Sequence, residues 1–179
     1  PGFRTNNIFY RKHAIVAAGG FDQRFVVQRE DIDLAFSILE SGGTIGYCPD
    51  VKVLHCHRDK EHWDLLKNCR NRRFDPLLYK KHPRAYRKWI GTPFTPSITA
   101  MAALHVLVAI SVGFGGVFPV IAVMADVGGA FLLAIRRNAH GTFDPLQLLR
   151  DAVSYCCAPL VLIAALLYGG IRYRKILLW

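Results

Sequence analysis

The sequence predicts an α/β fold in the N-terminal part of the chain, followed by transmembrane α-helices. An amphipathic helical stretch is followed by two short β-branched runs, which is an α/β pattern. Long apolar runs fill the C-terminal part, and the mean hydropathy of +0.21 is unusual for a purely soluble domain. We therefore expect an α/β half-domain at 1–58, a basic helical connector at 59–96, and a membrane region at 97–179 with two or three transmembrane helices.

The first predicted element is a short amphipathic helix from Asp31 to Glu40. Its apolar residues recur at helical spacing and are Leu34, Ala35, Ile38 and Leu39. Gly42-Gly43 supplies a C-terminal stop. Glu30 and Asp31 are therefore expected at the N-terminus of this helix.

Two short strands are predicted next, at Thr44–Cys48 and Val51–Leu54. Both runs are apolar or β-branched, and Pro49-Asp50 separates them. This pattern indicates a strand, a turn and a second strand, with His55 at the end of the second strand.

Three carboxylates stand at the start of the predicted helix: Glu30, Asp31 and Asp33. A structural interpretation is that they cap the helix and favour the positive end of its dipole. Their number favours a catalytic interpretation. Three neighbouring carboxylates repel one another, and a single helix cap does not require all three. Asp31 and Asp33 are about 200° apart on a helix, so we expect one to face a site and the other the scaffold.

Several motifs occur in an order that resembles a known family. They are Thr5 to Lys12, Gly19-Gly20-Phe21-Asp22, Glu30 to Leu34, Gly42, Pro49-Asp50 and His55. Together they are similar to the C-terminal half of a family 2 glycosyltransferase of the GT-A fold, which is Rossmann-like. The resemblance covers about the first 85 residues and includes Asn71–Phe74 and Tyr79–Pro83, which resemble segments after the catalytic core in membrane-attached members.

The resemblance implies inverting sugar transfer from a nucleotide-sugar donor to a hydroxyl acceptor in a polysaccharide, a glycolipid or a lipid-linked glycan. It implies that Asp31 is the general base, with Glu30 beside it as an orienting carboxylate. Asn7, Arg29 and Asp33 are the substrate-binding residues that it implies.

A divalent metal, Mn²⁺ or Mg²⁺, is the cofactor that the resemblance implies, with His55 near the metal and the diphosphate. Family members hold the metal mainly through an Asp-x-Asp motif in an N-terminal half, whereas this chain opens at Pro1 already past that point. Asp31-Ile32-Asp33 has the same letters but lies in the acceptor-side motif. We therefore expect a fragment that is catalytically inactive on its own.

The membrane region begins with an almost uninterrupted apolar run from Ser97 to Ile135. About 20 residues cross a bilayer, so a turn at Gly113–Gly116 would divide this run into two crossings. A second run, Ala152 to Ile171, is long enough for a third crossing. Asp126 and Gly128-Gly129 mark either a helix–helix interface or a tolerated polar position near a helix end.

The charges predict the orientation. Nine Lys or Arg residues and one acid, Asp75, lie between Lys67 and Trp89, just before the first apolar run. Such flanks are typical of the cytoplasmic side, so we expect a multi-pass protein of a bacterial or archaeal plasma membrane with its catalytic part in the cytoplasm. Arg136 and Arg137 agree with a hairpin, whereas Arg172 and Arg174 conflict with a third crossing.

Two other classes of function are considered. The net charge of +10 and the aromatic residues among the basic ones would suit a non-catalytic membrane protein that binds lipid or nucleic acid. Membrane lipid explains the same residues, so no nucleic acid is expected. A zinc module around His55, Cys56 and His57 lacks paired Cys-x-x-Cys spacing. The five cysteines do not suggest a disulfide scaffold.

Overall fold

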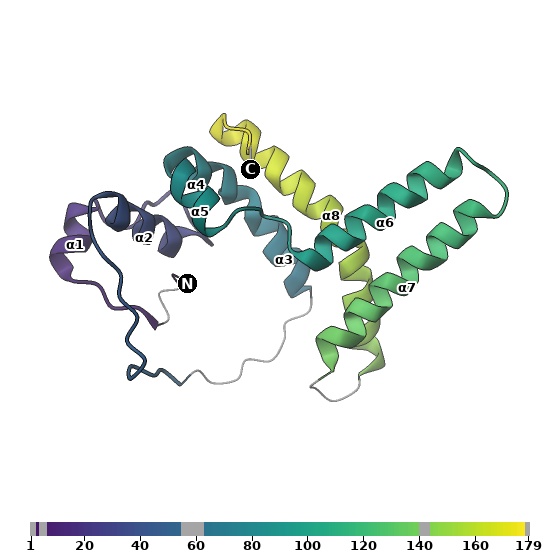
Figure 1. The fold of residues 1–179 in the computed structure, drawn as a ribbon, viewed down its shortest axis with the longest axis horizontal. Coiled ribbons are helices and arrows are strands. Elements are labelled where there is room, and N and C mark those ends of the chain that lie inside the picture. Colours follow the sequence, from purple (N-terminus) through teal and green to yellow (C-terminus); the bar gives the residue numbers. More distant parts are fainter. Residues whose placement is uncertain (1–2, 4–6, 55–62, 140–143, 178–179) are drawn as a thin grey trace. The chain divides into compact units, whose positions relative to one another are not determined.

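The computed structural model describes residues 3, 7–54, 63–139 and 144–177. Within these residues every regular element is helical (Figure 1). The elements are α1 (Lys12–Ala17), α2 (Glu30–Glu40), α3 (Asp64–Asn71), the 3₁₀ helix η2 (Arg72–Phe74), α4 (Asp75–Lys81), α5 (Pro83–Trp89), α6 (Pro96–Val112), α7 (Phe118–Asn138) and α8 (Pro145–Tyr173).

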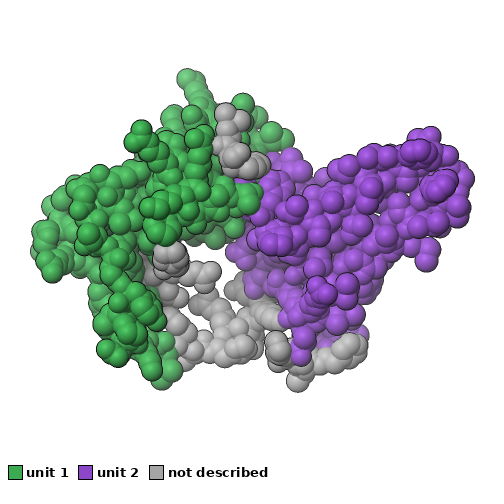
Figure 2. Space-filling view, in the orientation of Figure 1, with its two compact units in different colours: residues 1–59, 71–92, 166–179 green, residues 60–70, 93–165 purple. Residues whose placement is uncertain are grey.

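The chain divides into two compact units (Figure 2). Unit 1 comprises residues 1–59, 71–92 and 166–179, and unit 2 comprises residues 60–70 and 93–165. Unit 1 therefore combines the N-terminal segment, much of the basic connector and the last turns of α8.

The core of unit 1 is built from α2, the connector helices and the C-terminal segment. Its buried cluster consists of Phe3, Phe25, Ala35, Phe36, Phe74, Leu77, Leu78, Tyr79, Tyr86 and Leu177. Burying one large apolar side chain contributes about 1.5–3 kcal/mol, so this cluster supplies the main driving force for the unit. Leu177 joins the cluster from the far end of the chain.

Helix α2 confirms the predicted helix and begins one residue earlier, at Glu30. It ends at Glu40, and Gly42 has a left-handed φ of 88°. A side chain at Gly43 would collide with Ile38, because its Cβ would lie 2.7 Å from the Ile38 carbonyl oxygen. The glycine pair therefore stops the helix and lets the chain turn back past it.

The α/β prediction is wrong for the described residues, which contain no β-strand. Residues 44–54, predicted as two strands, have no regular structure on either side of a turn at Pro49-Asp50. A strand is stable only when a neighbouring strand pairs with it, and no described segment pairs with these residues. Their apolar side chains remain exposed, with Tyr47 at 92% and Leu54 at 99%. The described fold is all-α rather than part of a Rossmann-like GT-A domain.

Unit 2 contains the helical hairpin of α6 and α7, which lie side by side (Figure 1). The turn between them lies at the predicted glycines, and Gly115 and Gly116 have left-handed φ values of 63° and 60°. Gly129 lies so close to Leu104 that an added Cβ would approach its side chain to 2.8 Å. Asp126 faces a partner across the hairpin, because its carboxylate lies 3.4 Å from His105 Nε2.

The first part of α8 packs against the base of this hairpin within unit 2. The buried cluster there consists of Met101, Ala130, Ala134, Ala152 and Tyr155. Asn138 Nδ2 donates a hydrogen bond to Asp151 at 2.8 Å, and Arg137 Nε lies 3.4 Å from the same carboxylate. Polar contacts therefore join the end of α7 to α8.

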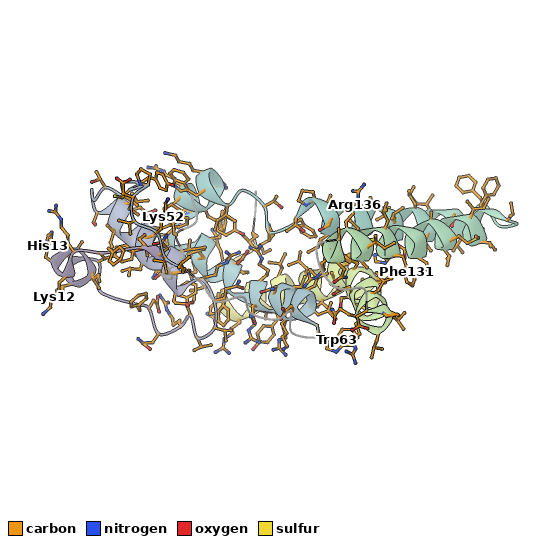
Figure 3. The ribbon with its side chains drawn as sticks, turned by 90° about the horizontal axis from the view of Figure 1, so that it is seen from below. Lys12, His13, Lys52, Trp63, Phe131 and Arg136 are labelled. Carbon is orange, nitrogen blue, oxygen red and sulfur yellow. The ribbon has the colours of Figure 1, made fainter. Side chains whose placement is uncertain are left out.

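Two described helices, α7 and α8, are long and apolar enough to cross a membrane, while α6 is apolar but shorter. Only 11% of the apolar stretch of α7 is buried inside the structure. Figure 3 shows side chains projecting on both sides of α6 and α7, with Phe131 and Arg136 labelled on α7. A membrane would give these exposed apolar side chains an apolar environment.

Candidate functional site

The N-terminal turn of α2 contains most of the acids that the sequence singled out. Arg29 precedes the helix with a left-handed φ of 84°, which costs a non-glycine residue about 1–2 kcal/mol. The first turn then carries Glu30, Asp31 and Asp33. Asp33 is buried, whereas Glu30 and Asp31 are only partly buried, so the three acids have different surroundings.

Arg29 is fixed by a buried ion pair. Its Nε donates to Asp75 Oδ1 at 2.7 Å, and its Nη2 donates to Asp75 Oδ2 at 3.0 Å. The Tyr86 hydroxyl donates to the same carboxylate at 2.9 Å, and Arg72 Nη1 does so at 3.2 Å. Burial, and then the charge of Asp75, raises the pKa of Tyr86, which keeps it a donor. These bonds attach the start of α2 to α4 and offset the backbone strain at Arg29.

Asp33 faces the connector helices. Lys81 Nζ donates to the Asp33 carboxylate at 2.7 Å, and His82 Nε2 lies 3.1 Å from Asp33 Oδ1. The other ring nitrogen of His82 lies 2.6 Å from Glu40 Oε2. Burial lowers the pKa of His82, but the hydrogen bonds to Asp33 and Glu40 outweigh it, so the pKa is raised. Asp33 therefore stabilises the packing of α2 on the connector.

Asp31 has a different environment. Its Oδ1 accepts a hydrogen bond from the backbone N of Ile32 at 2.8 Å, and it forms no ion pair among the described residues. Three nearby polar atoms are buried without a hydrogen-bond partner among the described residues: Tyr10 OH, Gln28 Oε1 and Glu30 Oε2. Burial, and then the charge of Asp31, raises the pKa of Tyr10. Such unpartnered groups are rare in folded proteins.

A cavity of about 1100 Å³ lies beside this region in unit 1. Asn7 and Tyr10 line it from one side, and the irregular segment 42–54 lines it from the other. Glu30 and Asp31 do not line the cavity, whereas Tyr10 lines it and is affected by the charge of Asp31.

The structure separates the predicted site residues into two groups. Asn7 is exposed and Glu30 and Asp31 are partly buried, whereas Arg29 and Asp33 are buried in ion pairs. The predicted metal-binding residue, His55, lies outside the described residues. Within the part of the chain that the structure describes, no three His, Cys, Asp or Glu side chains gather to hold a metal ion.

Sequence reasoning missed the partners of these acids, which are Asp75, Lys81, His82 and Tyr86. One signal was present: Asp75 is the single acid in a basic stretch, which suggests that it neutralises a specific cation. The sequence did not indicate that Lys81 and His82 are partners of the acids, because basic residues in this stretch are equally expected on a solvent-exposed helix face.

Comparisons of the chain with models of protein families, with curated proteins and with solved structures find no match.

Proposed function

We propose that this chain is part of a membrane-attached inverting glycosyltransferase of family 2 and that it carries the acceptor-side acids. The order of the motifs between residues 5 and 55 supports the proposal. The main structural support is Asp31, whose carboxylate is partly buried and forms no ion pair among the described residues. The all-α fold of the described residues adds no support, so the proposal rests on these side chains.

In this proposal Asp31 is the general base. Its carboxylate takes the proton of an acceptor hydroxyl while the hydroxyl oxygen forms a bond to the anomeric carbon of the donor sugar. The bond between that carbon and the nucleoside diphosphate breaks on the opposite face, which inverts the configuration. Glu30, whose Oε2 is buried and unpartnered among the described residues, orients the acceptor. No step is assigned to a metal ion.

The acceptor is a polysaccharide, a glycolipid or a lipid-linked glycan, and the protein is held in the membrane by several helices. At about 1.5 Å per residue, the 21 residues of α7 extend over roughly 31 Å, close to the thickness of a bilayer core. The basic connector before α6 favours a cytoplasmic position for the acids of α2.

An assay with membranes that contain the whole protein tests the proposal. We expect the release of a nucleoside diphosphate from one member of a panel of nucleotide-sugars when glycolipid or polysaccharide acceptors are present. Asp31→Asn should keep the fold and lower the turnover by roughly 10²-fold or more, because general-base catalysis contributes about that much. Asp50→Asn, in the exposed turn after Pro49, is the matched control. Equal turnover in the Asp31→Asn and Asp50→Asn variants would remove Asp31 from the mechanism.

A further inference from the structure

A second cavity, of about 560 Å³, lies in unit 1 at the last turns of α8. Three arginines line it, each from a different part of the chain: Arg24, Arg73 and Arg172. Gln23, Tyr168 and Tyr173 add polar groups, and no carboxylate of the described residues lines the cavity. The lining is therefore strongly positive and rich in hydrogen-bond donors.

The fold brings these arginines together through a close approach of backbones. Gly169 of α8 lies against the carbonyl group of Arg73, and no other residue would fit there because a Cβ would overlap that group. Lys80 Nζ also donates a hydrogen bond to the carbonyl oxygen of Tyr173 at 3.0 Å. Arg172 is therefore held close to Arg73 by contacts that do not use either guanidinium group.

Two of the three guanidinium groups have no acidic partner in the part of the chain that the structure describes. Arg24 forms a bidentate pair with Asp22, with distances of 2.6 Å and 3.0 Å. The guanidinium carbon of Arg73 lies 5.1 Å from the centre of the Phe74 ring, and that of Arg172 lies 5.9 Å from the centre of the Tyr173 ring. Neither forms an ion pair among the described residues. The Arg172 guanidinium also hydrogen-bonds Tyr173 and Tyr168, which line the same cavity. A guanidinium group has five N–H donors in a planar fork, so these contacts leave donors that match the oxygens of a phosphate group.

An apolar strip runs beside these charges on the same turns of α8. Leu167 is 63% exposed and Ile171 is 80% exposed, and the two lie one helical turn apart. Tyr168 and Arg172 form the neighbouring strip with the same spacing. Tyr and Arg at the end of an apolar helix are typical of the depth of lipid headgroups. The two strips together suit an amphiphile that has an anionic head and hydrocarbon chains.

We propose that this cavity binds the phosphate group of an anionic membrane lipid. Arg73 and Arg172 donate hydrogen bonds to the phosphate oxygens, and the hydrocarbon chains lie along Leu167 and Ile171. The proposal is independent of sugar transfer, because it uses none of the residues assigned to that reaction.

Equilibrium binding to the whole protein in neutral detergent tests the proposal. The probes are dioctanoyl phosphatidic acid, dioctanoyl glycerol, which lacks the phosphate, and inorganic phosphate. Only the phosphatidic acid is expected to bind tightly, as measured by titration calorimetry. The double variant Arg73→Gln/Arg172→Gln should bind it at least about tenfold more weakly, because two charge-assisted hydrogen bonds are lost.

The matched control is Arg84→Gln/Lys88→Gln, which removes two exposed positive charges from α5 in the same unit. Its affinity should change by less than about threefold, since exposed charges at a distance are screened. The double variant Arg73→Lys/Arg172→Lys keeps the charge and should restore part of the binding. Equal losses in the Gln variant and the control would overturn the proposal. Binding of inorganic phosphate or of dioctanoyl glycerol as tight as that of phosphatidic acid would also overturn it.

Discussion

At the scale of single residues, ionic side chains in unit 1 perform two different tasks. Arg29 with Asp75, and Asp33 with Lys81, are held in contacts that join α2 to the connector helices. Asp31 takes part in neither contact. Substitutions in the first group should therefore change the free energy of unfolding, whereas a substitution of Asp31 should leave it nearly unchanged.

Asp75→Ala is expected to lower the free energy of unfolding of unit 1 by about 3–5 kcal/mol, because it leaves the Arg29 charge buried and unpaired. Urea unfolding followed by tryptophan fluorescence measures the change. Asp50→Ala, at an exposed turn, should stay within about 0.5 kcal/mol of the unchanged protein. Similar values for both variants would show that the buried pair does not stabilise the unit.

The stability of unit 1 should also depend on pH through His82. Its pKa is raised above the ordinary value of 6.5, because hydrogen bonds to Asp33 and Glu40 outweigh burial. The folded state therefore binds the proton more tightly than the unfolded state does, and the stabilisation is complete below pH 6.5. It is lost as the pH rises through the folded-state pKa. Melting temperatures measured from pH 6 to pH 9 should fall more steeply in the unchanged protein than in His82→Gln.

His13, on the exposed surface of α1, provides the control for this experiment. A His13→Gln variant should keep the full pH dependence. If His82→Gln also kept it, the imidazole between Asp33 and Glu40 would not be the titrating group.

At the scale of elements, the sequence correctly predicted the features that depend on the residue pattern within one segment. The apolar spacing of α2, the glycine turn between α6 and α7 and the long apolar run of α8 are visible within each segment. The strands at 44–48 and 51–54 were predicted wrongly, because a strand depends on a partner that its own residues do not specify. The buried pair of Arg29 and Asp75 escaped prediction for the same reason, since 46 positions separate the two residues.

Gly169 is the clearest case of one residue that determines how an element packs. Gly169→Val should detach the last turns of α8 from η2, because the added side chain would occupy the position of the Arg73 carbonyl group. We expect a loss of at least about 2 kcal/mol in the stability of unit 1, in the range of overpacked sites. Gly128→Val is the control, since among the described residues no atom outside the nearby backbone of its own helix lies within 4 Å of a Cβ at that position. Equal melting temperatures for the two variants would contradict this packing.

At the scale of the whole molecule, the exposed apolar helices predict how the protein behaves in membranes. The full chain should resist extraction by carbonate, because removal would expose α7 and α8 to water. Single cysteines at Gly115 and Asn138, in a variant without the natural cysteines, report the topology. If α6 and α7 cross separately, an impermeant reagent should label position 115 from outside and position 138 only after the membrane is opened. Labelling of both positions from one side would exclude two crossings.

The composition of unit 1 has a consequence for how the protein is made. Leu177 belongs to the same buried cluster as Phe36 and Leu78, so the cluster is incomplete until residue 177 has left the ribosome. Helices α6 and α7 are synthesised before that moment, and a translocon would insert them while α2 and the connector still lack part of their core. The entropy of closing the long intervening segment rises only slowly with its length, so this late closure costs little once residue 177 is available. Until then the nascent unit exposes an apolar surface to chaperones and proteases.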